Sequence, residues 1–257
     1  MLGQIFTRIK SVFSKQKTVN QEKKLERVIE EKIDQLEKFF GFSINDSTYF
    51  VKALTHRSYL ELIPQLNKSN ERLEFLGDSV LGLIVSQHLF LAFSDKEEGF
   101  LTKYRSLMVN RDALAKAAAA MGLQNFILYD NRFVNGSSTG LKTILADALE
   151  AIIGAIYLDQ GFDTTKDIVY KWIIEPNTLD GGLPADRNFK GKLLEFAHSQ
   201  GFSSPLYDVI KEEGPEHDKK FTVEVLIDGK TFESGSGKSK KTAEQNAAKN
   251  ALDKLNQ

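Results

Sequence analysis

Apolar residues recur at helical spacing through the first two thirds of the chain, with polar and charged residues between them. Amphipathic helices are predicted at 21–38, 49–60, 101–121, 144–158 and 164–174. The most apolar run, at 80–93, predicts a helix in a core or subunit interface, because it falls short of the roughly 20 residues that span a bilayer. Almost no alternating strand pattern occurs here, so an all-helical first domain is expected.

The pattern changes after 176–187, a stretch whose glycine, proline and asparagine content is typical of a linker. A short amphipathic helix is predicted at 189–199. Strands are predicted at 206–210, 221–228 and 231–234. Asp228-Gly229 favours a hairpin turn between the last two strands, and an alanine-rich helix begins near Ser239. The predicted order of the second domain is therefore α-β-β-β-α.

These changes predict four segments: an N-terminal extension at 1–31, a helical domain at 32–175, the linker at 176–187 and the second domain at 188–257. Residues 1–18 carry four basic residues and no acid, with apolar residues at helical spacing. They lack the continuous apolar region and cleavage site of a signal peptide. A docked helix, contact with a membrane surface and an organelle transit peptide remain open interpretations.

Three acids occupy the start of the apolar helix. Glu71, Glu74 and Asp78 stand at positions i, i+3 and i+7, so an α-helix carries them on one face. Carboxylates near a helix N-terminus are stabilised by its dipole, which makes capping and solvation one interpretation. A metal or catalytic site is the other, because carboxylates beside an apolar core repel one another and lose hydration unless a cation neutralises them.

A second acidic pair, Asp147 and Glu150, lies on one face of the apolar helix predicted at 144–158. Two apolar helices that each present carboxylates can pack with those faces together. Ligation by oxygen alone suits a hard ion, Mg²⁺ or Mn²⁺. Such sites serve phosphoryl transfer, so the second pair favours the metal-site interpretation.

Composition excludes several other kinds of site. The 257 residues include no cysteine, which rules out disulfides, zinc–thiolate sites and cysteine nucleophiles and fits a reducing cytoplasm. A hydrophobic content of 41% is enough for a real core. The formal net charge of −1 gives no sign of nucleic-acid binding, so any such surface must be local.

One local basic cluster consists of Lys238, Lys240 and Lys241, at the start of the last predicted helix. Free N–H groups at a helix N-terminus favour phosphate, although a solvated face is the alternative interpretation. The preceding Gly-Ser-Gly-Lys-Ser superficially matches a phosphate-binding P-loop. Phe232 stands where that pattern needs its first glycine, so no nucleotide cofactor is expected.

Two stretches resemble known families. The stretch Asn70-Glu71-Arg72-Leu73-Glu74-Phe75-Leu76-Gly77-Asp78-Ser79 resembles the signature of the ribonuclease III family, and Asp147-x-x-Glu150 resembles its second acidic motif. Residues 54–58 and 98–110 also fit, and the resemblance covers nearly everything after about Lys32. Near the end, Lys238-Ser239-Lys240-Lys241-x-Ala243-Glu244-Gln245-x-Ala247-Ala248 and Gly214-Pro215-Glu216-His217 resemble a double-stranded-RNA-binding domain.

The resemblance implies a cytoplasmic, double-strand-specific endoribonuclease: an all-helical endonuclease domain followed by an RNA-binding domain, acting as a homodimer. It implies Mg²⁺, or Mn²⁺ as a substitute, held by Glu74, Asp78, Asp147 and Glu150, with Asp78, Glu150 and Glu71 as catalytic acids. Glu98 resembles a supporting acid near the site or the subunit junction. Phe75 resembles an aromatic residue that inserts into the partner subunit, whereas the apolar pattern alone assigns it to the core.

The family outcome is staggered cutting that leaves 5′-phosphate and 3′-hydroxyl ends, with ribosomal RNA precursors as the usual substrate. By resemblance, Lys238, Lys240 and Lys241 bridge major-groove phosphates. The His217 loop and the first helix of this domain, through Glu195 and His198, enter minor grooves. Leu194 and His198 occupy places where relatives often carry glutamine, so this helix departs from the family pattern for hydrogen bonding in the minor groove.

The alternative function is an inactive relative that binds duplex RNA as a scaffold. Such a relative should have lost one of the four core acids, and all four are present.

Overall fold

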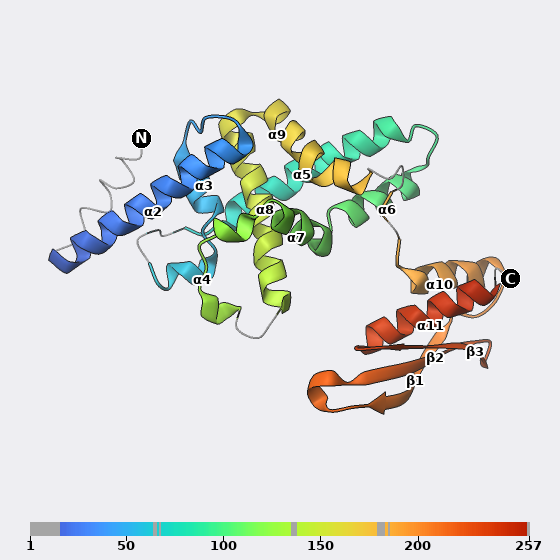
Figure 1. The fold of residues 1–257 in the computed structure, drawn as a ribbon. Coiled ribbons are helices and arrows are strands. Elements are labelled where there is room, and N and C mark those ends of the chain that lie inside the picture. Colours follow the sequence, from blue (N-terminus) through green and yellow to red (C-terminus); the bar gives the residue numbers. More distant parts are fainter. Residues whose placement is uncertain are drawn as a thin grey trace. The chain divides into compact units, whose positions relative to one another are not determined.

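A computed structural model describes residues 16–63, 66, 68–134, 138–178, 183–184 and 186–255. The chain divides into two compact units, Met1–Pro184 and Ala185–Gln257 (Figure 1). The described part of the first unit is helical, and the second unit combines two helices with three strands, so the predicted fold class is confirmed. The predicted basic face at 1–18 lies outside the residues whose side chains are described.

The first unit contains eight described α-helices, which Figure 1 shows as one packed group. They are α2 (Gln16–Phe40), α3 (Ser47–Ala53), α4 (Arg57–Leu60), α5 (Glu71–Ala92), α6 (Glu98–Met108), α7 (Arg111–Ala120), α8 (Ser138–Gln160) and α9 (Phe162–Val169). A π-helical turn at Tyr170–Ile174 continues α9, and single 3₁₀ turns occur at Leu123–Asn125, Asn131–Phe133 and Glu175–Asn177.

Two helices that were predicted to be continuous are each interrupted and form two shorter helices. The helix expected at 49–60 breaks before α4, because Thr55 forms a bridge with Leu128 and the His56 ring accepts a hydrogen bond from the Ser58 backbone N–H as a new N-cap. The helix expected at 101–121 breaks at Asn110, whose side chain accepts from the Ala113 N–H at 3.0 Å. Helical periodicity continues across both breaks, so a side-chain cap ended each helix without changing the apolar pattern.

Helices α5 and α8 cross at the centre of the first unit, with their backbones in contact (Figure 1). A Cβ atom on Gly77 would lie 1.7 Å from the Glu150 carbonyl oxygen, and one on Gly154 would lie 2.4 Å from the Leu73 carbonyl oxygen. Only glycine fits such an approach. The crossing therefore sets how the acidic faces of the two helices meet.

Among the described helices, α5 has the length and apolar composition of a membrane-spanning segment, because the helix begins at Glu71, ahead of the apolar run at 80–93 that was judged too short. Its first turns carry Glu71 and Glu74, and its Gly77 packs against α8 in the core of this unit. Leu81, Ile84, Val85 and Leu89 are buried there.

The second unit contains α10 (Phe189–Ser199), β1 (Leu206–Glu213), β2 (Lys220–Ile227), β3 (Lys230–Gly237) and α11 (Lys240–Leu255). The strands form one antiparallel sheet in the order β1-β2-β3, with the expected hairpin turn at Asp228-Gly229. Both helices pack against the sheet through a core that includes Leu193, Val225 and Ala247.

The glycine-rich end of β3 serves this packing. A Cβ atom on Gly235 would lie 2.1 Å from the Ala247 backbone nitrogen, and one on Gly237 would lie 2.7 Å from that of Ala243. The stretch that superficially matched a P-loop is thus strand backbone in contact with an alanine face of α11.

Candidate functional site

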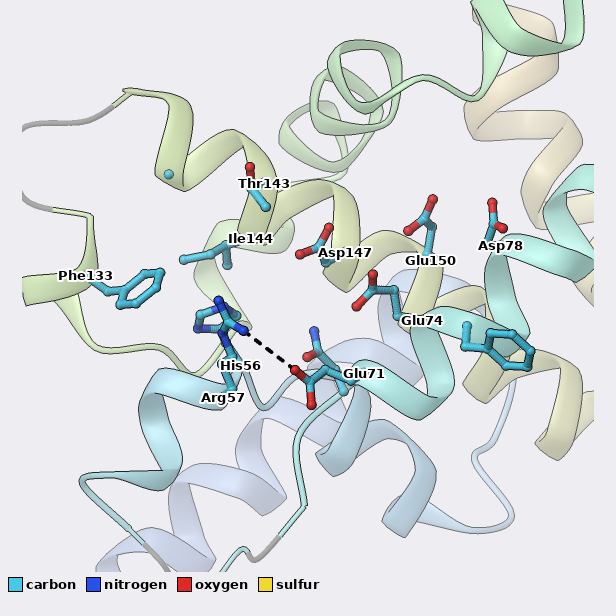
Figure 2. A pocket seen from close by; sticks show the side chains of 13 residues that line it. His56, Arg57, Glu71, Glu74, Asp78, Phe133, Thr143, Ile144, Asp147 and Glu150 are labelled. Carbon is cyan, nitrogen blue, oxygen red and sulfur yellow. Dashed lines mark ion pairs between the residues drawn. The ribbon is translucent and has the colours of Figure 1, made fainter.

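A pocket of about 630 Å³ opens where the starts of α4 and α5 meet α8 (Figure 2). Its lining is acidic at one end, with Glu74, Asp78, Asp147 and Glu150, and carries His56, Arg57 and Phe133 at the other. Helix α5 supplies Glu74 and Asp78, and α8 supplies Asp147 and Glu150. The predicted meeting of two acidic helix faces is therefore observed.

Three carboxylates converge most closely. One oxygen from each of Glu74, Asp147 and Glu150 lies within 4.8 Å of the others, and all three side chains are half-buried. Asp78 lines the same pocket beside them but is exposed and stands outside this closest group. The glycine contact between Gly77 and the Glu150 backbone brings these oxygens together.

Burial and mutual repulsion raise the pKa values of the acids in this cluster. Burial, followed by the charges of Asp78, Glu74 and Asp147, raises the pKa of Glu150 to about 8. Burial and the neighbouring acids also raise the pKa of Glu74. Burial raises the pKa of Asp147, an effect that the Arg111 and Arg57 charges oppose. The cluster destabilises its own charged form, and a cation among the carboxylates would relieve that repulsion.

The donor set consists entirely of carboxylate oxygens, which Mg²⁺ and Mn²⁺ prefer. The residues present therefore fit a hard divalent cation. The acidic cluster could hold a metal ion.

Glu71 lines the pocket but lies apart from the three converging carboxylates. The Ser69 hydroxyl donates to it at 2.8 Å, and an Arg57 guanidinium nitrogen lies 3.9 Å away, as the dashed line in Figure 2 marks. Glu98 is not brought to this pocket. It begins α6, accepts a hydrogen bond from the Thr102 hydroxyl at 2.6 Å, and lines a separate groove.

The apolar pattern was wrong about Phe75, whose side chain is 78% exposed instead of forming part of the core. It lies on α5 one position after Glu74 and is among the residues that line the acidic pocket. Periodicity could not distinguish this position, because α5 is apolar on most of its circumference.

Several residues that build the pocket were given no role from the sequence, although Asn70, Gly77 and Arg57 lie in segments that carry the family resemblance. Gly77 and Gly154 set the helix crossing, and their position one turn from an acid within an apolar helix was the available signal. Asn70, at the start of α5, is 2% exposed and lines the pocket, as do Arg57 and Phe133. Phe133 belongs to a short turn that carried no sequence signal.

In the second unit, Lys238, Lys240 and Lys241 are all exposed around the N-terminus of α11. Two of them face carboxylates: Lys240 lies 2.9 Å from Glu212, and Lys238 lies 3.0 Å from Asp218. The hydrogen bond from Lys240 holds the pKa of Glu212 below its usual value. The lysines form a compact cationic cluster with its own counterions.

The other predicted RNA-binding residues lie on different elements of this unit. Glu195 and His198 are exposed on α10, and the His198 Nε2 atom lies 3.1 Å from the Ser204 hydroxyl. His217 belongs to the turn Glu216–Asp218, and its side chain lies outside the described residues.

Comparison with known families matches both units. Residues 46–177 match a family described as Ribonuclease-III-like, and residues 189–255 match the double-stranded RNA binding motif. A protein named Ribonuclease 3 from Chlorobium chlorochromatii is 38% identical over 88% of this chain and 91% of its own length. One from Campylobacter jejuni strain RM1221 is 39% identical over 87% of this chain and 97% of its own.

Among solved structures, the nuclease domain of ribonuclease III from Campylobacter jejuni is similar, at 41% identity and a TM-score of 0.51. The match covers 56% of this chain and 97% of that domain. That structure is described as flexible in a region involved in its dimer formation.

Proposed function

This chain belongs to the ribonuclease III family, whose members are double-stranded-RNA-specific endoribonucleases, and on that premise we propose how its residues bind and cut the duplex. We propose that Glu74, Asp78, Asp147 and Glu150 hold Mg²⁺, with Mn²⁺ as a substitute. The convergence of three carboxylate oxygens within 4.8 Å carries this proposal.

Bound Mg²⁺ supplies an activated water and stabilises negative charge on the phosphate. The protein contributes the placement of the acids. Glu74 lies on α5 and Asp147 on α8. Glu150 retains a proton near neutral pH in the metal-free pocket, and Glu71 stands at the pocket wall as a further acid. Cleavage is proposed to leave 5′-phosphate and 3′-hydroxyl ends.

The RNA-binding domain is proposed to hold the duplex through Lys238, Lys240 and Lys241, which contact phosphates, with the Glu195, His198 and His217 region facing minor grooves. The exposure of the lysines and their position at a helix N-terminus support this assignment. Ribosomal RNA precursors as substrate and a cytoplasmic location are proposed from the family alone.

A homodimer is proposed through α5. Four large apolar side chains are exposed on this helix: Phe75 at 78%, Leu83 at 58%, Phe90 at 68% and Leu91 at 69%. Leu83 and Phe90 also line a groove of about 570 Å³, together with Leu101, Phe162 and Glu98. An aromatic side chain such as Phe75 of a second copy suits such a groove.

Incubation with a long RNA duplex, with and without Mg²⁺, followed by mapping of the product ends, tests the proposal. The parent chain should cut only with the metal, and Glu150→Gln should lower the cleavage rate by orders of magnitude. Duplex binding should survive in Glu150→Gln, because the lysines lie in the other unit. Cleavage by Glu150→Gln at the parental rate would show that the acidic cluster is not the catalytic centre.

A further inference from the structure

The pocket has a second end that the metal proposal does not use. Away from the cluster of Glu74, Asp147 and Glu150, its wall carries Arg57 at the start of α4 and Phe133 in a short turn (Figure 2). Asn70, the residue before α5, also lines the pocket. These residues are a cation, an aromatic ring and an amide, which differ in kind from the acids at the other end.

The Asn70 amide is the first sign that the pocket receives a ligand besides a metal ion. Asn70 is 2% exposed, and its Nδ2 atom has no hydrogen-bond partner among the described residues. The Asn70 backbone is fixed, since its N–H donates to the Thr55 carbonyl at 2.9 Å and its carbonyl accepts from Leu73 and Glu74. A buried donor left unpaired is unfavourable, and a ligand oxygen in the pocket would satisfy it.

Phe133 is the second sign. Its ring is 54% exposed at the pocket wall, beside the His56 ring at a centroid distance of 5.4 Å. The turn that carries it is anchored: the Phe133 N–H donates to the Asp130 carbonyl, the Asp130 N–H donates to the Ser58 hydroxyl at 3.0 Å, and that hydroxyl lies 2.8 Å from His56 Nδ1. An aromatic ring held in place but uncovered is suited to contact with a partner.

Arg57 supplies the charge. Its guanidinium lies 6.0 Å from the Phe133 centroid and 3.9 Å from Glu71, with 64% of the side chain exposed. An exposed ion pair at that separation is weak, so most of the five N–H donors of the guanidinium stay accessible to an anion. Planar guanidinium groups recognise phosphate with two parallel hydrogen bonds.

We propose that Arg57, Phe133 and Asn70 form a nucleotide subsite that holds the RNA strand next to the phosphodiester being cut. Arg57 binds a flanking phosphate, Phe133 packs against a ribose, and the Asn70 amide donates to a backbone oxygen. A ribose is the partner for Phe133 because paired bases in a duplex are not free to stack on a side chain. The subsite rests on the proposed function, since it places the strand against the acidic cluster.

Substrates with one altered nucleotide test the subsite. Single phosphates around the mapped cut are replaced by neutral methylphosphonates, and cleavage rates are measured for the parent chain and for Arg57→Gln. At one position the methylphosphonate should lower the cleavage rate of the parent about tenfold or more, as loss of one charge-assisted hydrogen bond does. The same replacement should leave the cleavage rate of Arg57→Gln unchanged, because that variant has already lost the contact. Arg72→Gln, an exposed arginine that does not line the pocket, should respond like the parent.

Phe133→Leu gives a second, independent test of the subsite. Removing the 2′-hydroxyl of one nucleotide changes the ribose that Phe133 is proposed to contact. Deoxy substitution at one nucleotide should alter the parent rate and leave the Phe133→Leu rate unchanged. Thermal unfolding checks that each variant is folded, and Arg57→Met replaces Arg57→Gln should the latter unfold. The subsite is overturned if the parent cuts the duplex and every altered nucleotide slows the Arg57 and Phe133 variants as much as it slows the parent. The proposed function would then remain intact. Failure of the parent to cut any duplex RNA overturns both.

Discussion

The pKa of Glu150 reflects both its burial and the charges of the other acids in the pocket. Its backbone carbonyl contacts Gly77, so its side chain is carried to the place where the other acids converge. Burial and three like charges raise its pKa to about 8, whereas the usual value is 4.5. A carboxyl group that resists ionisation here is the expected result of assembling a cation site without its cation.

This shift has a consequence for stability. Below pH 4.5 Glu150 is protonated in both the folded and the unfolded chain; between 4.5 and about 8 only the folded chain retains the proton. The raised pKa therefore stabilises the metal-free fold at low pH, and this contribution is lost as the pH rises through about 8. Melting temperatures measured in chelator should fall across this range for the parent and fall less for Glu150→Gln. A larger fall in the variant would contradict the assignment.

At the scale of elements, the crossing of α5 and α8 determines the pocket. The two helices could present acids on suitable faces and still hold them too far apart. Gly77 and Gly154 remove the side chains that would separate the backbones. The same device appears in the second unit, where Gly235 and Gly237 let β3 approach α11.

Gly77→Ala should disrupt the crossing. Its new methyl group would lie 1.7 Å from the Glu150 carbonyl, so the helices must separate, with an expected loss of about 2 kcal/mol or more in the free energy of unfolding. Gly82→Ala is the matched control on the same helix, where a Cβ atom meets nothing within 4 Å. That change should be neutral or stabilise by about 0.5–1 kcal/mol through helix propensity. Chemical denaturation measures both, and equal effects would show that the close approach is unimportant.

The lysine cluster of α11 predicts a pair of opposite effects on RNA binding. Lys240→Ala should weaken binding of every duplex sequence alike and reduce the slope of log affinity against log salt by about 1. Glu212→Gln removes the counterion that lies 2.9 Å from Lys240 and should tighten binding, by up to about fivefold for an exposed pair.

Glu213→Gln is the control for this pair, because Glu213 binds Lys211 at 2.8 Å and none of the three clustered lysines. Fluorescence anisotropy over a range of salt concentrations measures all three variants. An unchanged salt slope in Lys240→Ala would support the solvated-face interpretation of the cluster.

At the scale of the whole molecule, α5 of the first unit leaves several large apolar side chains exposed. Phe75, Phe90 and Leu91 are each more than two thirds exposed on this helix. Such a surface is typical of an interface between copies, and the adjacent groove gives it a complementary shape.

Phe75→Ala should therefore weaken association, as measured by sedimentation or light scattering at micromolar concentration. Truncating a large aromatic residue at the centre of an interface commonly costs about 2 kcal/mol or more, which raises the dissociation constant at least tenfold. Leu158→Ala, at an apolar residue that is 45% exposed on α8, should have no such effect. A fully active monomeric parent would contradict the dimer.

Much of this molecule was predictable from local pattern. Periods of 3.6 and 2 distinguished the helical unit from the α-β-β-β-α unit, and helical spacing placed Glu71, Glu74 and Asp78 on one face. These properties depend on residues close together in the sequence, and amino-acid pattern reports directly on such neighbours.

The sequence predicted that the two acidic helix faces meet, and the tertiary structure decided how closely each group approaches the others. It brought Glu74 within 4.8 Å of Asp147 and Glu150, left Asp78 beside them, and carried Glu98 to a different groove. It also exposed Phe75, broke two predicted helices at side-chain caps, and joined Arg57, Asn70 and Phe133 around one pocket. Distances between segments far apart in the sequence depend on how closely their backbones can approach. At the centre of the first unit, glycines set that approach, and the local apolar pattern does not predict their effect.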